Sequence, residues 1–158
     1  MTMTSERDSI TEEDHLEAES KIAKFSYKKP EKFDRSKVSV RLGQTDIVRA
    51  QVQVIHQGGE NNLHFHSRVD GMFTVLSGKI RFYGPGDELI ADCGPMEGLI
   101  MPRNARYWFD NIGEGDAEVM LVQGFHVPGA ETSGRTDSSE RKLADAGSLS
   151  GDFTAVVK

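Results

Sequence analysis

The chain has 158 residues, of which 37% are hydrophobic and 28% charged, and its formal net charge is -6. This length suits one domain with a hydrophobic core, and the acidic balance argues against a protein that binds nucleic acid through its phosphates. The single cysteine, Cys93, excludes an intramolecular disulfide and a thiolate cluster and favours a reducing compartment. The N-terminal residues are acidic, and no apolar run reaches the roughly 20 residues that span a bilayer. We therefore expect a cytoplasmic protein with no membrane partner.

The first segment, residues 1–35, is polar and is predicted to form an N-terminal arm. It places Ile10, Leu16, Ile22 and Phe25 among charged residues, a spacing that indicates a short helix. Its acidic run predicts a solvent-exposed face, with a partner-binding surface as the alternative.

Residues 36–128 are predicted to form the folded domain, because short alternating apolar segments are separated there by turn residues. The expected strands, in chain order, are KVSVRL, IVRAQVQVI, LHFH, MFTVLSGKIRFYG, ELIADCG, GLIMP, ARYWFDN and AEVMLVQGFHV. Turns are indicated between them, for example at Gly58-Gly59 and Gly94-Pro95. Many short strands with near-regular turns are typical of an all-β sandwich or barrel.

Residues 129–158 are predicted to be a polar C-terminal tail, because small and polar residues dominate this segment. Its apolar end, residues 153–157, is a candidate edge strand, on this chain or on a partner subunit.

His64 and His66 lie one residue apart in the expected strand LHFH. Successive side chains of a strand point to opposite faces, so the two imidazoles share one face and Phe65 points to the other. Such a pair is able to seat an Fe, Ni, Mn or Zn ion inside a barrel. The alternative is two histidines that only form hydrogen bonds.

Two motifs lie among these strands. In the first, Gly58 is followed by five residues, then by His64-x-His66, and later by Gly78. The second is PRNARYWFDN, residues 102–111. Together they resemble the two motifs of the cupin superfamily, and the resemblance covers residues 37–127. It implies an antiparallel jelly-roll β-barrel with a metal near the wide end of its cavity, and a homodimer, because cupins of this size commonly pair their barrels.

The glutamate of the first cupin motif falls on Gly71, which has no side chain to offer. The adjacent Asp70 fits the shorter spacing of that motif. However, strand alternation puts Asp70 on the side opposite the cavity, so it would bind a metal only if a bulge or the loop after His66 turned it inward. The alternative is a turn residue that accepts hydrogen bonds from the backbone.

Tyr107 occupies the position of the third cupin histidine. A phenol ionises at a pKa of about 10, so it coordinates readily only when a metal lowers that value. Tyr107 is therefore a candidate metal ligand and catalytic residue, and the alternative is a hydrogen-bonding phenol in a metal-free cavity.

The resemblance implies a metal-dependent small-molecule enzyme, and we favour an oxygenase-like reaction, because open positions on iron suit dioxygen. A cupin that binds a small molecule without catalysis, and a metal-free isomerase or cyclase with Tyr107 and one histidine as proton-transfer pair, remain alternatives. The candidate substrate contacts, all on strands that would face the cavity, are Gln51, Gln53 and Gln123.

Overall fold

The computed structural model describes residues 9–58, 60–140 and 150–153. In chain order the described elements are α1 (Glu12–Ser20), β1 (Lys37–Gln44), β2 (Val48–Ile55), β3 (Glu60–His66), β4 (Val69–Ser77), β5 (Ile80–Tyr83), the 3-10 turn η2 (Pro85–Asp87), β6 (Leu89–Cys93), β7 (Gly98–Met101), β8 (Tyr107–Asn111), β9 (Ala117–Phe125), β10 (Arg135–Asp137) and β11 (Ser150–Phe153). Among these residues no helix is long and apolar enough to cross a membrane.

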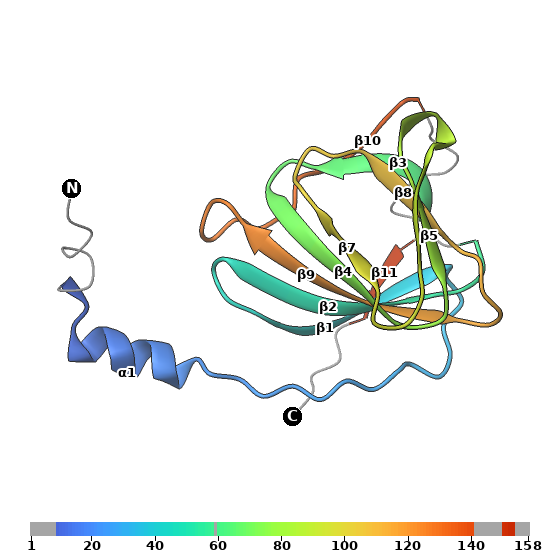
Figure 1. Ribbon diagram of the computed structural model, residues 1–158. Helices are drawn as coiled ribbons and strands as arrows, with labels where there is room; N and C mark the ends of the chain where they lie inside the picture. The colour runs from blue at the N-terminus through green and yellow to red at the C-terminus, as the bar shows by residue number, and fades with distance from the viewer. Residues whose placement is uncertain (1–8, 59, 141–149, 154–158) are drawn as a thin grey trace.

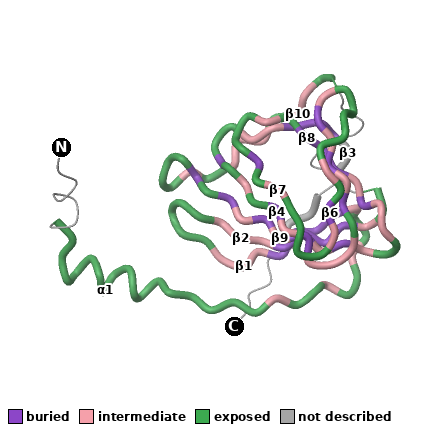
Figure 2. Tube along the Cα trace, viewed as in Figure 1, coloured by how far each residue is buried: buried purple, intermediate pink, exposed green. Residues whose placement is uncertain are grey.

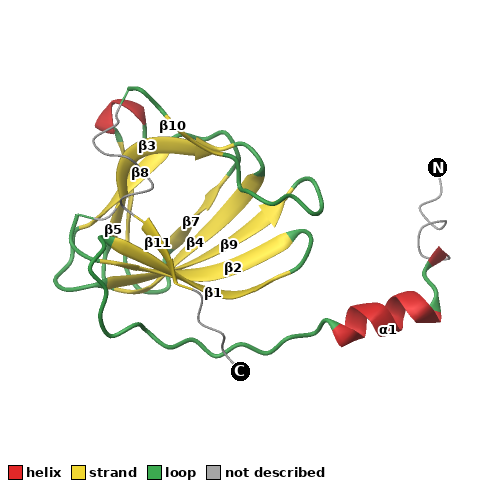
Figure 3. Ribbon diagram, turned by 180° about the vertical axis from the view of Figure 1, so that it is seen from behind, coloured by secondary structure: helices red, strands yellow, loops and turns green. Residues whose placement is uncertain are grey.

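The strands form two sheets that curve around a common interior (Figures 1 and 3). A six-stranded sheet has the order β11-β1-β2-β9-β4-β7, and a five-stranded sheet has the order β10-β3-β8-β5-β6. Neighbouring strands are antiparallel except β11, which runs parallel to β1. The predicted all-β jelly-roll barrel is thus confirmed.

The interior changes from apolar to polar along the same strands. Towards one end it is filled by a core whose buried members include Val75, Ile80, Phe82 and Phe109, and buried residues gather there in Figure 2. On β2 the inward-facing row continues from Ile55 through three polar residues, Gln53, Gln51 and Arg49, which oppose β9 in register. The core therefore closes one end of the barrel and leaves a polar lining at the other.

The N-terminal arm is anchored to the barrel at some points and projects from it at others. Helix α1 begins with a capping box between Thr11 and Asp14 and has no buried residue, and both ribbon views show it away from the barrel (Figures 1 and 3). The predicted short helix is confirmed. Closer to the barrel, the Tyr27 hydroxyl donates to Glu118 Oε1 at 2.7 Å, and burial together with this carboxylate raises the pKa of Tyr27.

The segment predicted as a polar tail also contributes strands. Strand β10 pairs with β3, and β11 pairs with β1. Two short strands beyond residue 128 thus belong to the two sheets, one to each. Most of the candidate edge strand at 153–157 lies outside the described residues.

Candidate functional site

A cavity of about 270 Å³ occupies the polar end of the barrel, between the two sheets. One wall carries three of the predicted site residues, namely His64, His66 and Tyr107. The facing wall carries the three predicted substrate contacts, Gln51, Gln53 and Gln123. The barrel therefore brings six of the seven predicted site residues to one cavity.

His64 is held in one tautomer by its own strand. The side chain is 2% exposed, and its Nδ1 lies 2.7 Å from the carbonyl oxygen of Asn62. A carbonyl oxygen only accepts, so Nδ1 carries the proton and the lone pair of the neutral ring is on Nε2. Metal-binding histidines are oriented by this kind of hydrogen bond.

His66 lies beside His64 on the same face of β3. The centroids of the two rings are 5.3 Å apart and nearly perpendicular. His66 Nδ1 contacts the hydroxyl of Ser133 at 2.9 Å, and Arg135 is its register partner on β10. The second imidazole is thus positioned by the segment that the sequence assigned to a tail.

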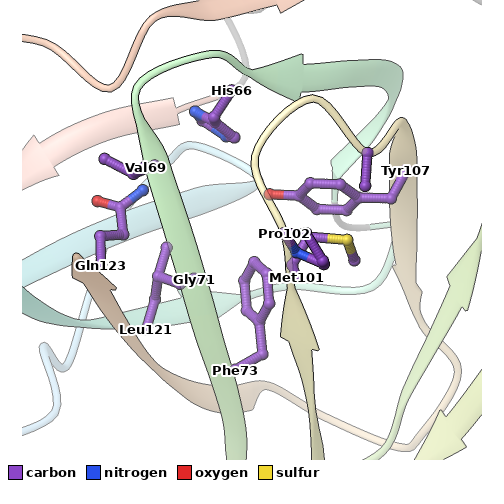
Figure 4. A pocket seen from close by; sticks show the side chains of 10 residues that line it. His66, Val69, Gly71, Phe73, Met101, Pro102, Tyr107, Leu121 and Gln123 are labelled. Carbon is purple, nitrogen blue, oxygen red and sulfur yellow. The ribbon is translucent and has the colours of Figure 1, made fainter. Parts of the chain in front are cut away.

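Tyr107 completes the group from the neighbouring strand. It opposes His64 in register, with ring centroids 4.5 Å apart, and it lies 6.3 Å from His66 by the same measure. Figure 4 shows its hydroxyl pointing into the pocket that it shares with His66 and Gln123. Two imidazoles and one phenol therefore converge on the same space.

The turn before β8 leads the chain into the strand that carries Tyr107. Asn104 takes a φ of 71°, a left-handed conformation that asparagine tolerates, and it stands where the cupin motif has glycine. Its backbone N–H donates to the carbonyl oxygen of His66 at 2.8 Å. At the far end of the strand Asn111 donates to two backbone carbonyls, of Ile55 and Gly115. The matching residues of the second motif thus serve the framework of the site.

Asp70 is not brought together with the histidines. Its side chain is exposed, and its carboxylate accepts the backbone N–H of Arg103 at 2.8 Å. No bulge turns it inward, because β4 pairs regularly with β9 at this point. This placement matches the alternative role of Asp70, a residue that accepts a hydrogen bond from the backbone.

Gly71 does line the pocket beside His66 and Tyr107. A Cβ added there would meet Leu121 Cδ1, the mobile end of a side chain, at 3.2 Å. In the described part of the chain no group of three or more His, Cys, Asp or Glu side chains is able to hold a metal ion. The backbone position of the cupin glutamate thus faces the pocket, but the residue there has no carboxylate.

Two of the three glutamines, Gln123 and Gln53, differ in their hydrogen bonding. Gln123 Oε1 accepts from Arg49 Nε at 3.3 Å, and Gln123 is 4% exposed. Gln53 is equally buried at 5%, yet its Oε1 accepts no hydrogen bond within the described structure. Gln53 also lines the cavity, so its Oε1 is an acceptor that water or a small molecule in the cavity is able to reach.

Basic residues are the part of the site that the sequence reading missed. Lys37, Arg41 and Arg135 line the cavity together with Arg49. The signal for the first two was present, since the strand KVSVRL alternates and places Lys37, Ser39 and Arg41 on one face. Arg135 lies in the supposed tail, where no sequence pattern indicated a strand.

His56 lies outside this cavity, near the N-terminal arm. Its ring stacks on Phe33 with centroids 3.9 Å apart, and its Nδ1 contacts Asp116 Oδ1 at 2.5 Å. The hydrogen bond to Asp116 raises the pKa of His56 above its ordinary value. His56 therefore fastens the arm to the barrel and does not line the cavity.

Comparisons with known proteins support the fold. No protein-family model and no curated protein matches the sequence. Among solved structures, a double-stranded β-helix protein from Klebsiella pneumoniae is 18% identical, with a TM-score of 0.52 over 64% of this chain and 84% of that one. An RmlC-like cupin from Methanocaldococcus jannaschii is 17% identical, with a TM-score of 0.54 over 66% and 92%.

A polyketide cyclase, RemF from Streptomyces resistomycificus, is also similar. It is 18% identical, and the TM-score is 0.51 over 59% of this chain and 68% of that one. At such identities the likeness establishes the architecture and leaves the chemistry to be argued from the site.

Proposed function

We propose that this chain, which has the cupin fold, is a metal-dependent small-molecule enzyme of the oxygenase type. The observation that carries the proposal is the convergence of His64, His66 and Tyr107 in one cavity. The fold supports the proposal in outline, because the solved structures that resemble this chain include an enzyme, the polyketide cyclase.

The donor set fits a metal ion with few protein ligands. His64 presents an Nε2 lone pair because the carbonyl oxygen of Asn62 holds the proton on Nδ1. The ring of His66 is oriented by the Ser133 hydroxyl, which is able to donate to Nδ1 or to accept from it. When bound there, an Fe, Ni, Mn or Zn ion supplies a Lewis acid with several coordination positions open to small molecules. The lack of a carboxylate ligand makes this a weaker site than one with a charged ligand set.

The chain's own residues would do the remaining work. The Tyr107 hydroxyl is placed to give or take a proton at its phenol oxygen, and the ring is 3% exposed. Phe73 and Leu121 belong to the apolar part of the cavity lining. Gln123 and Gln51 offer amide groups that orient polar atoms of a substrate.

The experiment is the metal content of protein purified without chelator or affinity metal. We expect near-stoichiometric transition metal in the parent protein and its loss in a His64→Ala/His66→Ala double variant. The matched control is His15→Ala/His126→Ala, because both of these histidines are exposed and lie outside the cavity. An equal metal content in both double variants, or no metal in the parent protein, would contradict the proposal of a metal centre. Iron in the site would direct the activity assay to dioxygen uptake.

A second candidate function rests on the contact between His64 and Tyr107. Their ring centroids are 4.5 Å apart, and the described cavity lining contains no carboxylate. A metal-free acid–base reaction, isomerisation or cyclisation, would use these two groups as its proton-transfer pair. A binding protein without catalysis would use them only as hydrogen-bonding groups. If metal-free protein converts a bound ligand and Tyr107→Phe abolishes this conversion, the protein is an acid–base enzyme and not a binding protein without catalysis.

A further inference from the structure

We infer that the N-terminal arm is an interaction surface for a second copy of this chain, and that two arms pair antiparallel about a two-fold axis near Ile22. In this arrangement the acidic helix α1 of each copy lies against the basic segment 21–29 of the other. The inference concerns a surface outside the cavity and does not depend on the proposed function.

The arm consists of an acidic half followed by a basic half. Helix α1, EEDHLEAES, has acidic residues and no Lys or Arg, whereas residues 21–29, KIAKFSYKK, have lysines and no acidic residue. Glu12 and Glu19 in the first half, and Lys24 and Lys28 in the second, are exposed and form no ion pair with any described residue. Each half therefore has charges available for the opposite half of another copy.

Within one chain the two halves run away from each other. Both ribbon views show the arm stretched past the barrel with α1 at its far end (Figures 1 and 3). Among the described residues the one ion pair between the halves is that of Lys21 with Glu17, a helical turn apart at 3.1 Å. The basic half is held to the barrel by Lys29, whose Nζ lies 3.3 Å from Asp116 Oδ2. The complementary charges therefore meet in full only when a second arm lies alongside in the opposite direction.

The helix presents its charged and apolar residues on one face. Glu12, Leu16 and Glu19 follow each other at spacings of four and three residues, so their side chains lie along one stripe of α1. Leu16 is 58% exposed. The stripe therefore offers an apolar side chain between two carboxylates.

The basic half carries matching residues at matching distances from Ile22. A helix rises about 1.5 Å per residue and an extended chain about 3.3 Å per residue. On this scale Leu16 lies about 13 Å before Ile22, and Phe25 lies about 10 Å after it. The pairs whose distances from Ile22 agree to within about 3 Å are Glu19 with Lys24, Leu16 with Phe25 and Glu12 with Lys28. One two-fold axis thus pairs opposite charges with each other and apolar side chains with each other.

Exposed apolar side chains lie where the two arms would meet. Ile22 is 81% exposed and Phe25 47%. Both line a groove of about 680 Å³ between the arm and the β1–β2 hairpin, and the barrel side of this groove includes Leu42 and Val48. In the paired arms Ile22 meets Ile22 of the second copy, whose Leu16 enters the groove beside Phe25. Burial of these side chains supplies the affinity.

The charges decide the direction of pairing. Exposed ion pairs contribute little affinity, but like charges placed opposite each other disfavour an arrangement. Parallel arms would set acid against acid and lysine against lysine, so the antiparallel arrangement is selected.

The groove also continues onto the barrel. Ala50, which lines it, opposes Val122 on β9, and Val122 opposes Met72 on β4, which in turn opposes Ile100 on β7. These side chains form one apolar row across the outer face of the six-stranded sheet. A second copy held by the arm is therefore placed next to an apolar sheet face.

The experiment is sedimentation velocity of the full chain over a concentration series, which gives the mass and the Kd of the dimer. We expect twice the chain mass of 17.5 kDa. Glu12→Lys/Glu19→Lys and Lys24→Glu/Lys28→Glu should each raise the Kd at least tenfold, because each places like charges opposite each other. The control is Glu88→Lys/Glu114→Lys, which makes the same charge change at exposed residues of the barrel and should keep the parent Kd.

Mixing the two arm variants tests the pairing itself. An equimolar mixture should form a heterodimer with a Kd close to that of the parent protein, because the reversed charges then face each other with opposite sign. Far-UV circular dichroism of each variant shows that it is folded.

Three results would overturn the inference. A monomeric parent protein would leave the arm to a basic partner of another kind. A dimer whose Kd is the same in both arm variants would place the interface elsewhere, for example on the sheet face alone. Arm variants that are weakened but do not associate when mixed would show that α1 meets a surface other than the basic half of the arm.

Discussion

His64 and Tyr107 oppose each other across β3 and β8, with ring centroids 4.5 Å apart. This contact joins the two motifs of the sequence at the place where a cupin has its metal ligands. Because Tyr107 stands in the position of a histidine and Gly71 in the position of a glutamate, the cavity offers two imidazoles and one phenol as the donors of the proposed metal site. The predictions below concern what these replacements change.

Gly71→Glu should raise the affinity for a divalent metal by at least tenfold, which requires only about 1.4 kcal/mol. The new carboxylate would enter the pocket beside His66 and Tyr107, and the one close contact is with the movable Leu121 Cδ1. Competition against a chelating dye measures the affinity. Gly71→Gln is the control, since it has the same shape without the charge, and equal gains in both variants would contradict the reasoning.

Tyr107→Phe should weaken metal binding about tenfold or more while changing the free energy of unfolding by less than about 1.5 kcal/mol. The ring is 3% exposed and packs against Phe73 with centroids 5.6 Å apart, so phenylalanine keeps this packing. Urea unfolding of the metal-free protein and metal titration test the two halves separately. Unchanged metal affinity would show that the phenol is not a ligand.

The stability of the protein should fall as the pH rises through the folded-state pKa of His56. That pKa is raised from 6.5, first by the hydrogen bond to Asp116, so the stabilisation is fully present below 6.5 and is lost above it. Burial tends to raise the pKa of Asp116, but hydrogen bonds from His56 and Lys29 hold it below 3.8. The contribution of Asp116 is therefore present above 3.8 and is lost as the pH falls through the lowered value.

The urea concentration at the midpoint of unfolding, measured from about pH 5 to pH 9, tests the contribution of the His56–Asp116 pair. The fall in stability above pH 6.5 should disappear in His56→Gln. The control is His126→Gln, which should keep the parent profile because His126 is exposed and its Nδ1 contacts the carbonyl oxygen of Arg68 rather than a carboxylate. An unchanged profile in His56→Gln would assign the pH dependence to other groups.

We also propose that the protein is a homodimer through the outer face of the six-stranded sheet. Met72 and Ile100 are register partners on β4 and β7, and they are 41% and 71% exposed. Apolar side chains grouped on a sheet face favour association. Light scattering should give twice the chain mass of 17.5 kDa, and Met72→Glu/Ile100→Glu should give the single-chain mass. A monomeric parent protein contradicts the proposal.

Much of the fold could be predicted from the sequence, because strands and turns are local features. Alternating residues such as Gln51 and Gln53 were assigned to one face, and that face is the cavity. For Asp70 two sequence arguments disagreed. Strand alternation placed its side chain away from the cavity, whereas the spacing of the first motif suggested a metal ligand inside it. The regular pairing of β4 with β9 decided in favour of alternation.

The sequence by itself determined which side chains share a strand face, because the period of two follows from backbone geometry, and it paired His64 with His66. Only the tertiary structure decided what stands opposite them. Arg135 reaches His66 through the pairing of β10 with β3, and Lys37 and Arg41 join Gln53 through β1 and β2. Such neighbours are distant in sequence and are set by sheet register and core packing, which no local pattern encodes. The basic residues of the cavity are therefore brought together by the barrel and not by any single segment.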